Sequence, residues 1–393
     1  MYFCHTKKTT YGKLVPMNLL LITQDFPPKT GGIETYSFEL AKRFRTNVKK
    51  FGVIAPSHSQ AMDSNLPFEV FRVPVKDSLL PFVAPMALLD VIGKSRFDTV
   101  LHAQWQTVIA SVFTRKMIGY PKKIYVAAHA RELLIEPFAG QGGAISKQLH
   151  KFRKKLLSQV DGFFPVSRYT AGLLENEGVS QEKIQIVKNG TDPHFFSKKD
   201  TEALSKELKV ENKKVILSIC RLVSRKGMDL VLHALNEIVS RNPNVVYLVG
   251  GSGPDSFRLK RLCDTLNLQD HVKFLGRIPE EELPYYYSLA DVFVMPAKSD
   301  PPDVEGFGIV FLEANACKTP VIGSKSGGIP DAIVDGETGL LVDENDAEQL
   351  AMAIWKLITN DELSHQMGEA GRKRILSEIN WDTSAQKILA VMR

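Results

Sequence analysis

Cysteine is scarce in this chain of 393 residues, and its four copies lie far apart in the sequence. Cys4, Cys220, Cys263 and Cys317 form no C-x-x-C pair and have no histidine at metal-ligand spacing. This argues against a disulfide framework and against a zinc site. Uninterrupted runs of about 18 apolar residues are also lacking, and the longest candidates, such as residues 17–23, end within one strand's length, so we expect no membrane-spanning helix. The cysteine pattern favours a reducing cytoplasm.

The first sixteen residues lack the features of a secretory signal. They include Lys7, Lys8 and Lys13, but no apolar stretch of about 7 to 15 residues and no small-residue cleavage site follows these lysines. Residues 17–22 then have the composition of a first buried strand. We therefore predict that residues 1–16 are a non-core extension that the fold does not need, with Met17 as the natural start.

The rest of the composition is typical of a globular protein. The chain is 44% hydrophobic and 24% charged, with 27 Gly and 21 Pro, which excludes disorder, collagen and a coiled coil. From residue 17 onward, short apolar segments alternate with amphipathic helices, a pattern that predicts βαβ units and parallel sheets. Strands are predicted in a first series at 18–23, 52–55, 69–73, 98–101, 123–128, 161–166 and 184–188. A second series is predicted at 214–219, 244–249, 271–275, 291–295, 319–322 and 339–342.

A polar junction separates the two series. Residues 189–193 have the composition of a turn, and residues 197–212 are polar and charged. We therefore expect a first domain at 17–195, completed by a C-terminal helix at 376–393 with Trp381 as its anchor, and a second domain at 196–375. Because open parallel sheets bind ligands at the carboxyl ends of their strands, this α/β organisation predicts a cleft between the domains.

Positive charge gathers in the first half of the chain. Residues 1–195 contain 26 Lys and Arg against 15 Asp and Glu, whereas residues 196–393 contain 24 against 29. Five of these cations fall on one predicted helix: Lys147, Lys151, Arg153, Lys154 and Lys155. Such a helix suits an anionic lipid surface or a phosphorylated acceptor, although an ordinary solvated helix face explains the same charges.

Glycine-rich turns follow a strand in each half. Gly31 and Gly32 precede a predicted helix, whose free N–H groups can bind a phosphate; a simple helix-entry turn explains the pair equally well. Residues 250–253 contain three glycines, but Ser256 replaces the third glycine of a dinucleotide fingerprint. The phosphate-binding sequence G-x-x-x-x-G-K-[ST] is absent. Neither turn identifies a ligand by itself.

Charged residues follow two strands of the second series. Arg221 and Lys226 come just after the strand at 214–219, where two cations suit a diphosphate or are simply surface charges. Glu305 and Glu313 bracket a glycine-rich turn into a helix, so both carboxylates can point into one pocket. Carboxylates accept hydrogen bonds from sugar hydroxyls, and the backbone N–H groups of residues 307–310 can hold phosphate oxygens.

In this order, these motifs resemble the retaining glycosyltransferases of family 4, which have the GT-B fold of two Rossmann-like domains facing a central cleft. The resemblance covers nearly all of residues 17–393 and includes Asn189–Asp192 and Ser326–Gly328. Residues 23–34 and 303–314 are most similar to the phosphatidylinositol mannosyltransferase B type, which uses GDP-mannose. Lys318 stands where the family usually has glycine. The resemblance implies a hexosyltransferase, with mannose as the best guess, acting on a glycan or glycolipid in the cytoplasm or at the inner face of the membrane.

The resemblance also implies a role for individual residues. Arg221 and Lys226 would bind the donor diphosphate and stabilise the leaving group. Glu313 would bind the nucleotide ribose and Glu305 the sugar hydroxyls. His129, which by itself is typical of a structural histidine, matches a family position that contacts the transferred sugar. The other expected donor-binding residues are Gly31, Gly32, Gly251, Phe307, Gly308, Ile309 and Val310.

No metal is expected, because Asp300 and Asp303 do not have D-x-D spacing. The family is usually described by same-face displacement, in which the leaving phosphate helps to deprotonate the acceptor. Three alternatives remain open: a UDP-sugar-dependent hexosyltransferase of polysaccharide or lipopolysaccharide synthesis, a nucleotide-sugar 2-epimerase, and a non-catalytic nucleotide-sugar-binding protein. The expected partners are a nucleotide sugar, a glycan or glycolipid acceptor and an anionic membrane, and no nucleic acid.

Overall fold

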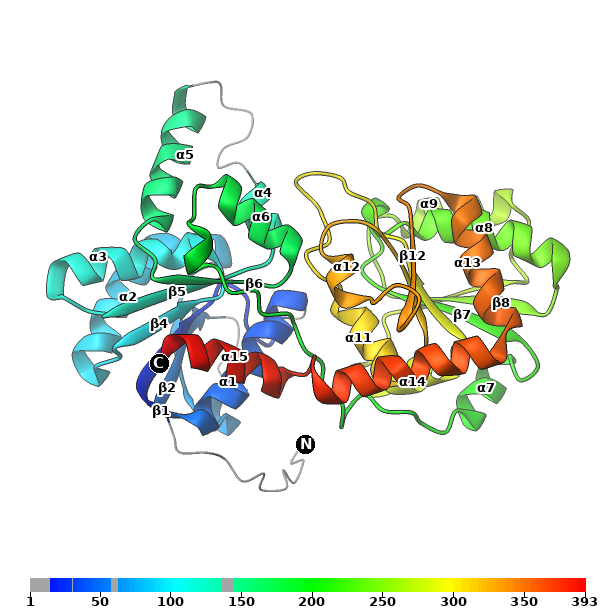
Figure 1. The fold of residues 1–393 in the computed structure, drawn as a ribbon, viewed down its shortest axis with the longest axis horizontal. Helices are drawn as coiled ribbons and strands as arrows, with labels where there is room; N and C mark the ends of the chain where they lie inside the picture. Colours follow the sequence, from blue (N-terminus) through cyan, green and yellow to red (C-terminus); the bar gives the residue numbers. More distant parts are fainter. Residues whose placement is uncertain (1–14, 30, 58–62, 136–143) are drawn as a thin grey trace.

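Two six-stranded parallel sheets make up the computed structural model, which describes residues 15–29, 31–57, 63–135 and 144–393 (Figure 1). The first sheet has the strand order β3-β2-β1-β4-β5-β6, and the second has the order β12-β11-β10-β7-β8-β9. Both orders start in the middle and reverse, as in a doubly wound sheet. The α/β fold class expected from the sequence is therefore confirmed.

The bounds of the elements follow the chain. The first domain contains β1 (Val15–Ile22), α1 (Gly32–Asn47), β2 (Val48–Pro56), β3 (Glu69–Val73), α2 (Leu80–Ser95), β4 (Thr99–His102), α3 (Val108–Ile118), β5 (Lys123–Ala128), α4 (Arg131–Leu134), α5 (Ala144–Leu157), β6 (Gly162–Pro165) and α6 (Arg168–Asn176). The second contains α7 (Glu202–Leu208), β7 (Lys214–Ile219), α8 (Met228–Arg241), β8 (Val245–Gly250), α9 (Ser256–Thr265), β9 (Val272–Gly276), α10 (Leu283–Leu289), β10 (Val292–Met295), α11 (Ile309–Ala316), β11 (Val321–Ser324), α12 (Ile329–Ala332), β12 (Gly339–Val342), α13 (Ala347–Thr359) and α14 (Asp361–Ser377). The last helix is α15 (Trp381–Met392).

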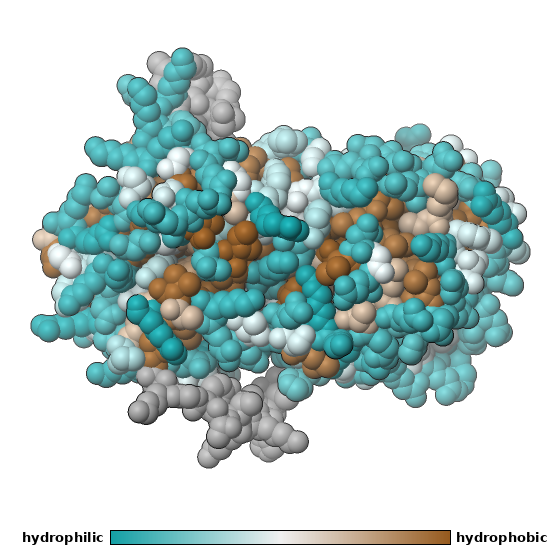
Figure 2. Space-filling model, in the orientation of Figure 1, coloured by the Kyte–Doolittle hydropathy of each residue, from teal (hydrophilic) through white to brown (hydrophobic). Residues whose placement is uncertain are grey.

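Helices cover both faces of the first sheet. Along the central strand β1, Leu19 and Leu21 are buried in one core cluster with α1, whereas Leu20 and Ile22 are buried in another with α2. Because side chains alternate along a strand, a strand covered on both faces must be apolar at nearly every position. This explains the unbroken apolar segment of β1. On the outer surface, Figure 2 shows mainly hydrophilic residues, with apolar patches on both domains.

One described helical segment, Asp77–Ser95, is long and apolar enough to cross a membrane by length and composition alone. The sequence expectation of no membrane-spanning helix rested on uninterrupted apolar runs, and this segment contains no such run. In the structure, α2 lies against the first sheet, where a stripe including Leu80, Ala84 and Leu88 is fully buried. The segment qualifies because its outward face is apolar as well, although Asp90 and Lys94 lie near its end.

Two sequence expectations about element ends are corrected. Residues 184–188 are not a strand: the backbone N–H groups of Gln185 and Val187 donate to β6, but the pairing with β6 is limited to an isolated bridge. The chain then leaves the sheet edge, because Lys188 turns toward Asp331 of the second domain. At the other end, β1 begins at Val15, which is buried and pairs with Val48, so the non-core extension cannot include residues 15 and 16. Residues 1–14 lie outside the described residues.

The chain crosses between the domains twice at neighbouring points. The first crossing is at residues 189–193, and the second leads from α14 to α15, which packs on α1 of the first domain. Thr191 and Asn380 form a parallel bridge where the crossings meet. A Cβ at Gly190 would lie 2.3 Å from the backbone of Asn380, so only glycine permits this approach. Trp381 begins α15 and packs edge-on against Tyr36 of α1.

Candidate active site

A buried carboxylate held by two cations lies at the carboxyl ends of the second sheet. Glu305, in the loop before α11, accepts hydrogen bonds at Oε2 from Lys226 Nζ at 2.5 Å and from Arg225 Nη1 at 3.0 Å. Burial alone would raise the pKa of Glu305, but the two cations outweigh it and lower the pKa to about 2. Glu305 is therefore a carboxylate at any pH near neutrality.

Arg225 is a site residue that the sequence analysis missed. Besides Glu305, its guanidinium approaches Asp303, with Nε 3.3 Å from Oδ1. Arg131 of the first domain approaches the same Asp303 oxygen at 3.2 Å, so the network links the two domains. Its position in the sequence, directly before Lys226 and shortly after a strand end, could have identified Arg225 as a site residue. Arg221 behaves differently: its side chain is exposed and makes no ion pair or hydrogen bond with the described residues.

Glu313 lies on the second turn of α11. The hydroxyl of Tyr287, from α10, donates a hydrogen bond of 2.7 Å to Glu313 Oε2. Burial raises the pKa of Glu313 to about 7, although the Tyr287 hydrogen bond acts in the opposite direction. Glu305 and Glu313 are thus two carboxylates on one loop and helix whose surroundings push their pKa values apart.

The start of α11 has the geometry of an anion site. Gly308 caps the helix with φ +92°, and a Cβ there would also meet the Phe311 ring at 2.7 Å, so glycine is required. Phe307 is buried in the core just before it, whereas Ile309 and Val310 are half-buried. The first N–H groups of a helix have no intrahelical acceptor, so those of Ile309 and Val310 remain available to a phosphate.

The two expected glycine turns differ in how closely other atoms approach the glycines. Gly31 and Gly32 lie at the start of α1, where a Cβ at Gly31 would lie 2.5 Å from Glu34 Oε2 and one at Gly32 would meet nothing within 4 Å. Gly251 has φ +114°, and a Cβ there would lie 1.9 Å from the carbonyl oxygen of Cys220. The fold itself therefore requires Gly251, whether or not it also contacts a ligand.

His129 faces the second domain from the end of β5. Its Nε2 atom is buried and has no hydrogen-bond partner among the described residues, and its ring packs edge-on against Tyr36 with centroids 4.6 Å apart. Burial lowers the pKa of His129 to about 4, so the ring is neutral. A Cβ at Gly306 would lie 2.2 Å from the His129 carbonyl oxygen. The segment of His129 and the loop of Glu305 therefore touch across the cleft.

Glu132 supports this segment and was not singled out from the sequence. Its Oε1 accepts a 2.6 Å hydrogen bond from the backbone N–H of His129, whereas its buried Oε2 has no partner among the described residues. Burial raises the pKa of Glu132 to about 7. Ala130, between the two, has φ +83°, a conformation that is strained for a residue with a side chain. A buried carboxylate thus fixes the turn that presents His129.

The basic helix α5 is only partly a surface of free cations. Lys147, Lys151, Lys154 and Lys155 are exposed. Arg153 is buried: its guanidinium pairs with both carboxylate oxygens of Glu177 and lies over the Trp105 ring. Arg153 therefore does not belong to the expected acceptor or membrane surface, because its charge stabilises the packing of α5 instead.

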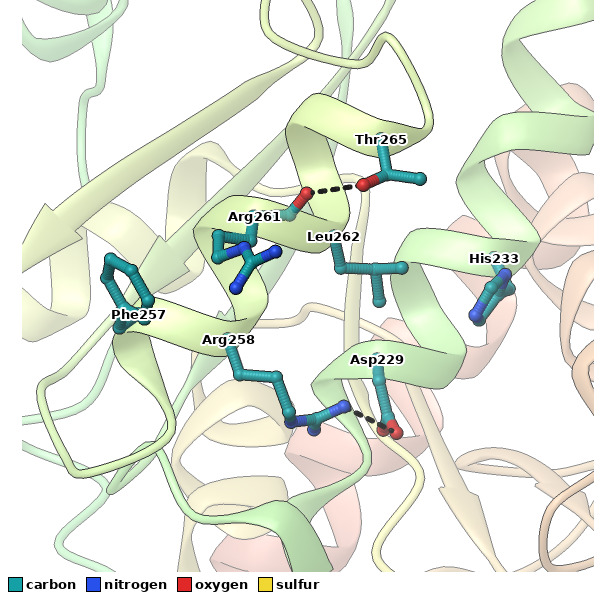
Figure 3. A pocket seen from close by; sticks show the side chains of 7 residues that line it. All are labelled: Asp229, His233, Phe257, Arg258, Arg261, Leu262 and Thr265. Atoms are coloured by element: carbon teal, nitrogen blue, oxygen red, sulfur yellow. Dashed lines mark hydrogen bonds and ion pairs between the residues drawn. The ribbon is translucent and has the colours of Figure 1, made fainter.

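A pocket of about 370 Å³ lies between α8 and α9 and contains none of the expected site residues (Figure 3). Arg258 reaches across it to Asp229, with Nη1 3.4 Å from Oδ2, and Asp229 also accepts a 3.0 Å contact from Lys298. The carboxylate of this pocket is therefore already paired with two cations. Within the described part of the chain, no group of three or more His, Cys, Asp or Glu residues could hold a metal ion.

Comparison with known protein families matches both halves of the chain. Residues 30–195 match the family "Glycosyltransferase Family 4", and residues 199–374 match "Glycosyl transferases group 1". Among curated proteins, the chain is 29% identical over 385 residues to the GDP-mannose-dependent alpha-(1-6)-phosphatidylinositol monomannoside mannosyltransferase of Mycolicibacterium smegmatis, covering 95% of this chain and 98% of that protein. It is 28% identical over 382 residues to the GDP-mannose-dependent monoacylated alpha-(1-6)-phosphatidylinositol monomannoside mannosyltransferase of Corynebacterium glutamicum, covering 95% and 97% of the two chains.

Solved structures share the fold at lower sequence identity. Sucrose-phosphate synthase from Thermosynechococcus elongatus has a TM-score of 0.78 at 22% identity, covering 96% of this chain and 98% of that one. Anabaena HepE in complex with UDP has a TM-score of 0.78 at 19% identity, covering 96% and 99%. These similarities do not favour the epimerase or the non-catalytic alternative. With both halves matched in order, the chain belongs to the retaining glycosyltransferases of family 4, and it is a hexosyltransferase with the GT-B fold.

Proposed function

We propose that the chain transfers mannose from GDP-mannose to a hydroxyl group of a glycolipid. The transfer chemistry rests on the ion pairs of Glu305 with Arg225 and Lys226. They hold a carboxylate beside two cations at the carboxyl ends of β7 and β10. The choice of donor rests on the near full-length similarity to GDP-mannose-dependent mannosyltransferases. The acceptor class rests on the same relatives, whose names specify phosphatidylinositol mannosides.

In this proposal, the second domain binds the donor. Lys226 and the exposed Arg221 bind the diphosphate, the N–H groups at the start of α11 bind its oxygens, and Glu313 accepts hydrogen bonds from the ribose. Glu305 holds hydroxyls of the sugar, and Gly251 and Phe307 shape the walls of the site. Positive charge beside the diphosphate stabilises the negative charge that grows there as the sugar leaves.

The transfer itself exchanges one bond to the anomeric carbon for another. The bond from that carbon to the diphosphate oxygen breaks, and the acceptor oxygen forms its bond on the same face, so the configuration is retained. The acceptor proton passes to the departing phosphate oxygen, which has become more basic. Neutral His129 faces the sugar from the first domain, and Gly31 and Gly32 bring α1 against the diphosphate from the opposite side. No metal is required in this scheme.

The acceptor would approach through the first domain. The exposed cations Lys147, Lys151, Lys154 and Lys155 suit the phosphate groups of an anionic lipid or a phosphorylated acceptor. We accordingly place the reaction on the cytoplasmic side of a membrane, with the enzyme bound to its surface.

Calorimetric titration of the purified chain with GDP, UDP and ADP, each also as its sugar conjugate, tests the donor assignment. Selective binding of GDP and GDP-mannose is expected. A preference for UDP would keep the fold and mechanism but overturn the mannose assignment, and no binding of any nucleotide would overturn the proposed site. Turnover of GDP-mannose with a phosphatidylinositol monomannoside, followed by NMR of the product linkage, then tests transfer and retention. Turnover should persist in the presence of a chelator.

A further inference from the structure

We propose that Asp331 is a positioning residue that holds the two domains together and so keeps Glu305 opposite His129 during transfer. Asp331 lies on α12 of the second domain, shortly after the turn Ser326–Gly328, which the proposed donor site does not use. This role rests on the placement of Glu305 and His129 at the sugar under the proposed function, but not on the identity of that sugar.

The carboxylate of Asp331 is buried, and its donors come from the first domain. Its Oδ2 accepts a 2.8 Å hydrogen bond from the backbone N–H of Arg168, the first residue of α6. Its Oδ1 lies 3.1 Å from Nε of the same arginine and 3.2 Å from Lys188 Nζ. Among the described residues, no group of the second domain donates to this carboxylate. These interactions therefore form only when the domains are together.

The contact completes the N-terminus of α6. Ser167 is the N-cap, and its hydroxyl accepts the N–H of Thr170 at 3.1 Å, but the N–H of Arg168 has no acceptor within the helix. Asp331 supplies this acceptor, and its negative charge is favoured at the positive end of the helix dipole. Figure 1 shows α6 on the side of the first domain that faces the second domain, where α12 lies. A helix of one domain is thus capped by a residue of the other.

Asp331 is linked to the loop of Glu305 through one short turn. The N–H of Asp331 donates to the carbonyl of Gly328 at 3.0 Å, and the N–H of Gly328 donates to the carbonyl of Glu305 at 2.8 Å. A Cβ at Gly328 would lie 1.8 Å from the carbonyl oxygen of Gly306 and 2.8 Å from the hydroxyl of Ser167, so glycine is required for this turn to fit between them. A displacement of Asp331 from α6 would therefore move the Glu305 loop as well.

On the first domain, the same contact lies beside the segment of His129. The strand that leads into α6 is β6, which pairs with β5, and His129 directly follows β5. The N–H of Val166 donates to the carbonyl of Ala128 at 3.1 Å, so the two strand ends are joined next to His129. Asp331 therefore attaches the second domain to the neighbour of the strand that presents His129, and one contact positions groups on both sides of the cleft.

The other ion pair between the domains is less suited to this role. The side chains of Arg131 and Asp303 are 64% and 41% exposed, so water weakens their attraction, whereas the side chain of Asp331 is 4% exposed. Loss of the Asp331 charge would leave the half-buried Lys188 without its carboxylate in the closed form, whereas opening exposes Lys188 to water. The penalty would therefore fall on the closed form alone.

Small-angle scattering of the nucleotide-free chain, together with transfer kinetics, tests this role. Asp331→Asn should lower the ratio of closed to open molecules about tenfold or more, the factor expected when a hydrogen bond to a charged group is lost. The radius of gyration should rise, and kcat should fall more than the affinity for GDP, which the second domain binds. The matched control Asp346→Asn removes a carboxylate that caps α13 within the second domain, where it accepts the N–H of Gln349 at 2.8 Å. This control should keep the radius and kcat of the wild type.

Arg168 allows the backbone contact to be removed separately. Arg168→Ala removes the guanidinium and keeps the N–H, whereas Arg168→Pro removes both. Proline is well tolerated at the first position of a helix, and Ser167 already has the extended conformation that precedes it, with φ −155° and ψ 166°. Arg168→Pro should therefore open the cleft more than Arg168→Ala while α6 still forms. Adding Asp331→Asn to Arg168→Pro should have little further effect, because both substitutions remove the same contact.

Three results would overturn the proposal. They are separated domains in the nucleotide-free wild type, an unchanged radius and kcat in both Asp331→Asn and Arg168→Pro, and fully additive effects of these two substitutions. If Asp331→Asn does not fold, the comparison of Arg168→Pro with Arg168→Ala decides the question. Failure of the wild type to bind GDP would count against the proposed function instead, since the scattering is measured without nucleotide.

Discussion

Replacement of Glu313 by glutamine should stabilise the protein at alkaline pH while weakening donor binding. Glutamine keeps the size of the side chain and can still accept the hydrogen bond from Tyr287 that Glu313 Oε2 accepts at 2.7 Å. It cannot carry the charge that burial disfavours at this position. The variant therefore separates the stability that the buried charge of Glu313 costs from the contribution of this charge to donor binding.

The size of the effect follows from the pKa. Burial raises the pKa of Glu313 from an ordinary value near 4.5 to about 7. The native state thus holds a proton that the unfolded chain has already released, so the free energy of unfolding falls as the pH rises through this window. At about 1.4 kcal/mol per pKa unit, the loss reaches about 3 kcal/mol above pH 7. Glu313→Gln should be more stable than the wild type by roughly 1 kcal/mol near pH 5 and by about 3 kcal/mol near pH 8.

Urea unfolding of both proteins near pH 5 and near pH 8 measures this difference, and calorimetry with GDP at the higher pH measures the functional loss. Glu132, whose pKa burial also raises, is present in both proteins and cancels from the comparison. Tyr287→Phe provides a second check: it removes the hydrogen bond that favours the charged form, so it should raise the pKa of Glu313 further and extend the fall in stability to higher pH. A pH-independent difference, or destabilisation near pH 8, would refute the reasoning.

Three further predictions concern the cleft. Arg225→Gln should raise the pKa of Glu305 from about 2 because one of its two cations is lost; the acid limb of the pH profile of kcat/KM should move to higher pH, whereas Arg225→Lys should largely keep it in place. An unchanged acid limb would mean that Arg225 does not act on Glu305. Arg221→Ala should weaken GDP binding about tenfold or more, since a hydrogen bond to a charged group contributes about 1.5–3 kcal/mol, whereas Arg258→Ala on α9 should not. Full transfer activity in Arg221→Ala would exclude its assigned role. Gly306→Ala places a Cβ 2.2 Å from the His129 carbonyl oxygen, so it should hold the domains apart: small-angle scattering should show a larger radius of gyration and transfer activity should fall, with little change in the melting temperature. An unchanged radius with full activity would show that the cleft tolerates the clash.

Much of the fold is predictable from the sequence because it depends on local periodicity. The apolar segment of β1 and the alternation of strands and helices require only that both faces of each sheet be covered. Residues 184–188 have strand composition too, but their pairing depends on where the chain must go next, which is toward Asp331. This path depends on tertiary contacts with the second domain, so the local sequence pattern does not predict it.

The site is predictable where a motif fixes the backbone and less so where side chains compete for partners. The positions of Gly308 and Glu305 follow from the turn into α11. Arg221 and Arg225 both lie within a few residues of the same strand end, so the sequence alone does not show which of them pairs with Glu305. Arg153 lies in the same basic segment as the four lysines of α5, yet it is buried against Glu177. Its helical position faces the core, and only the packing of α5 shows this.

The two neighbouring crossings at Gly190 and Asn380 restrict how the halves of the molecule can move. A single crossing would let one domain twist freely against the other, whereas two crossings that are paired through Thr191 and Asn380 restrict this twisting. We expect rotation about this paired segment to be the motion that disturbs the fewest of these contacts. Opening would thus part Gly306 from His129 while barely disturbing the contact of Trp381 with Tyr36. We expect such a motion to open and close the cleft while the bridge between Thr191 and Asn380 stays paired.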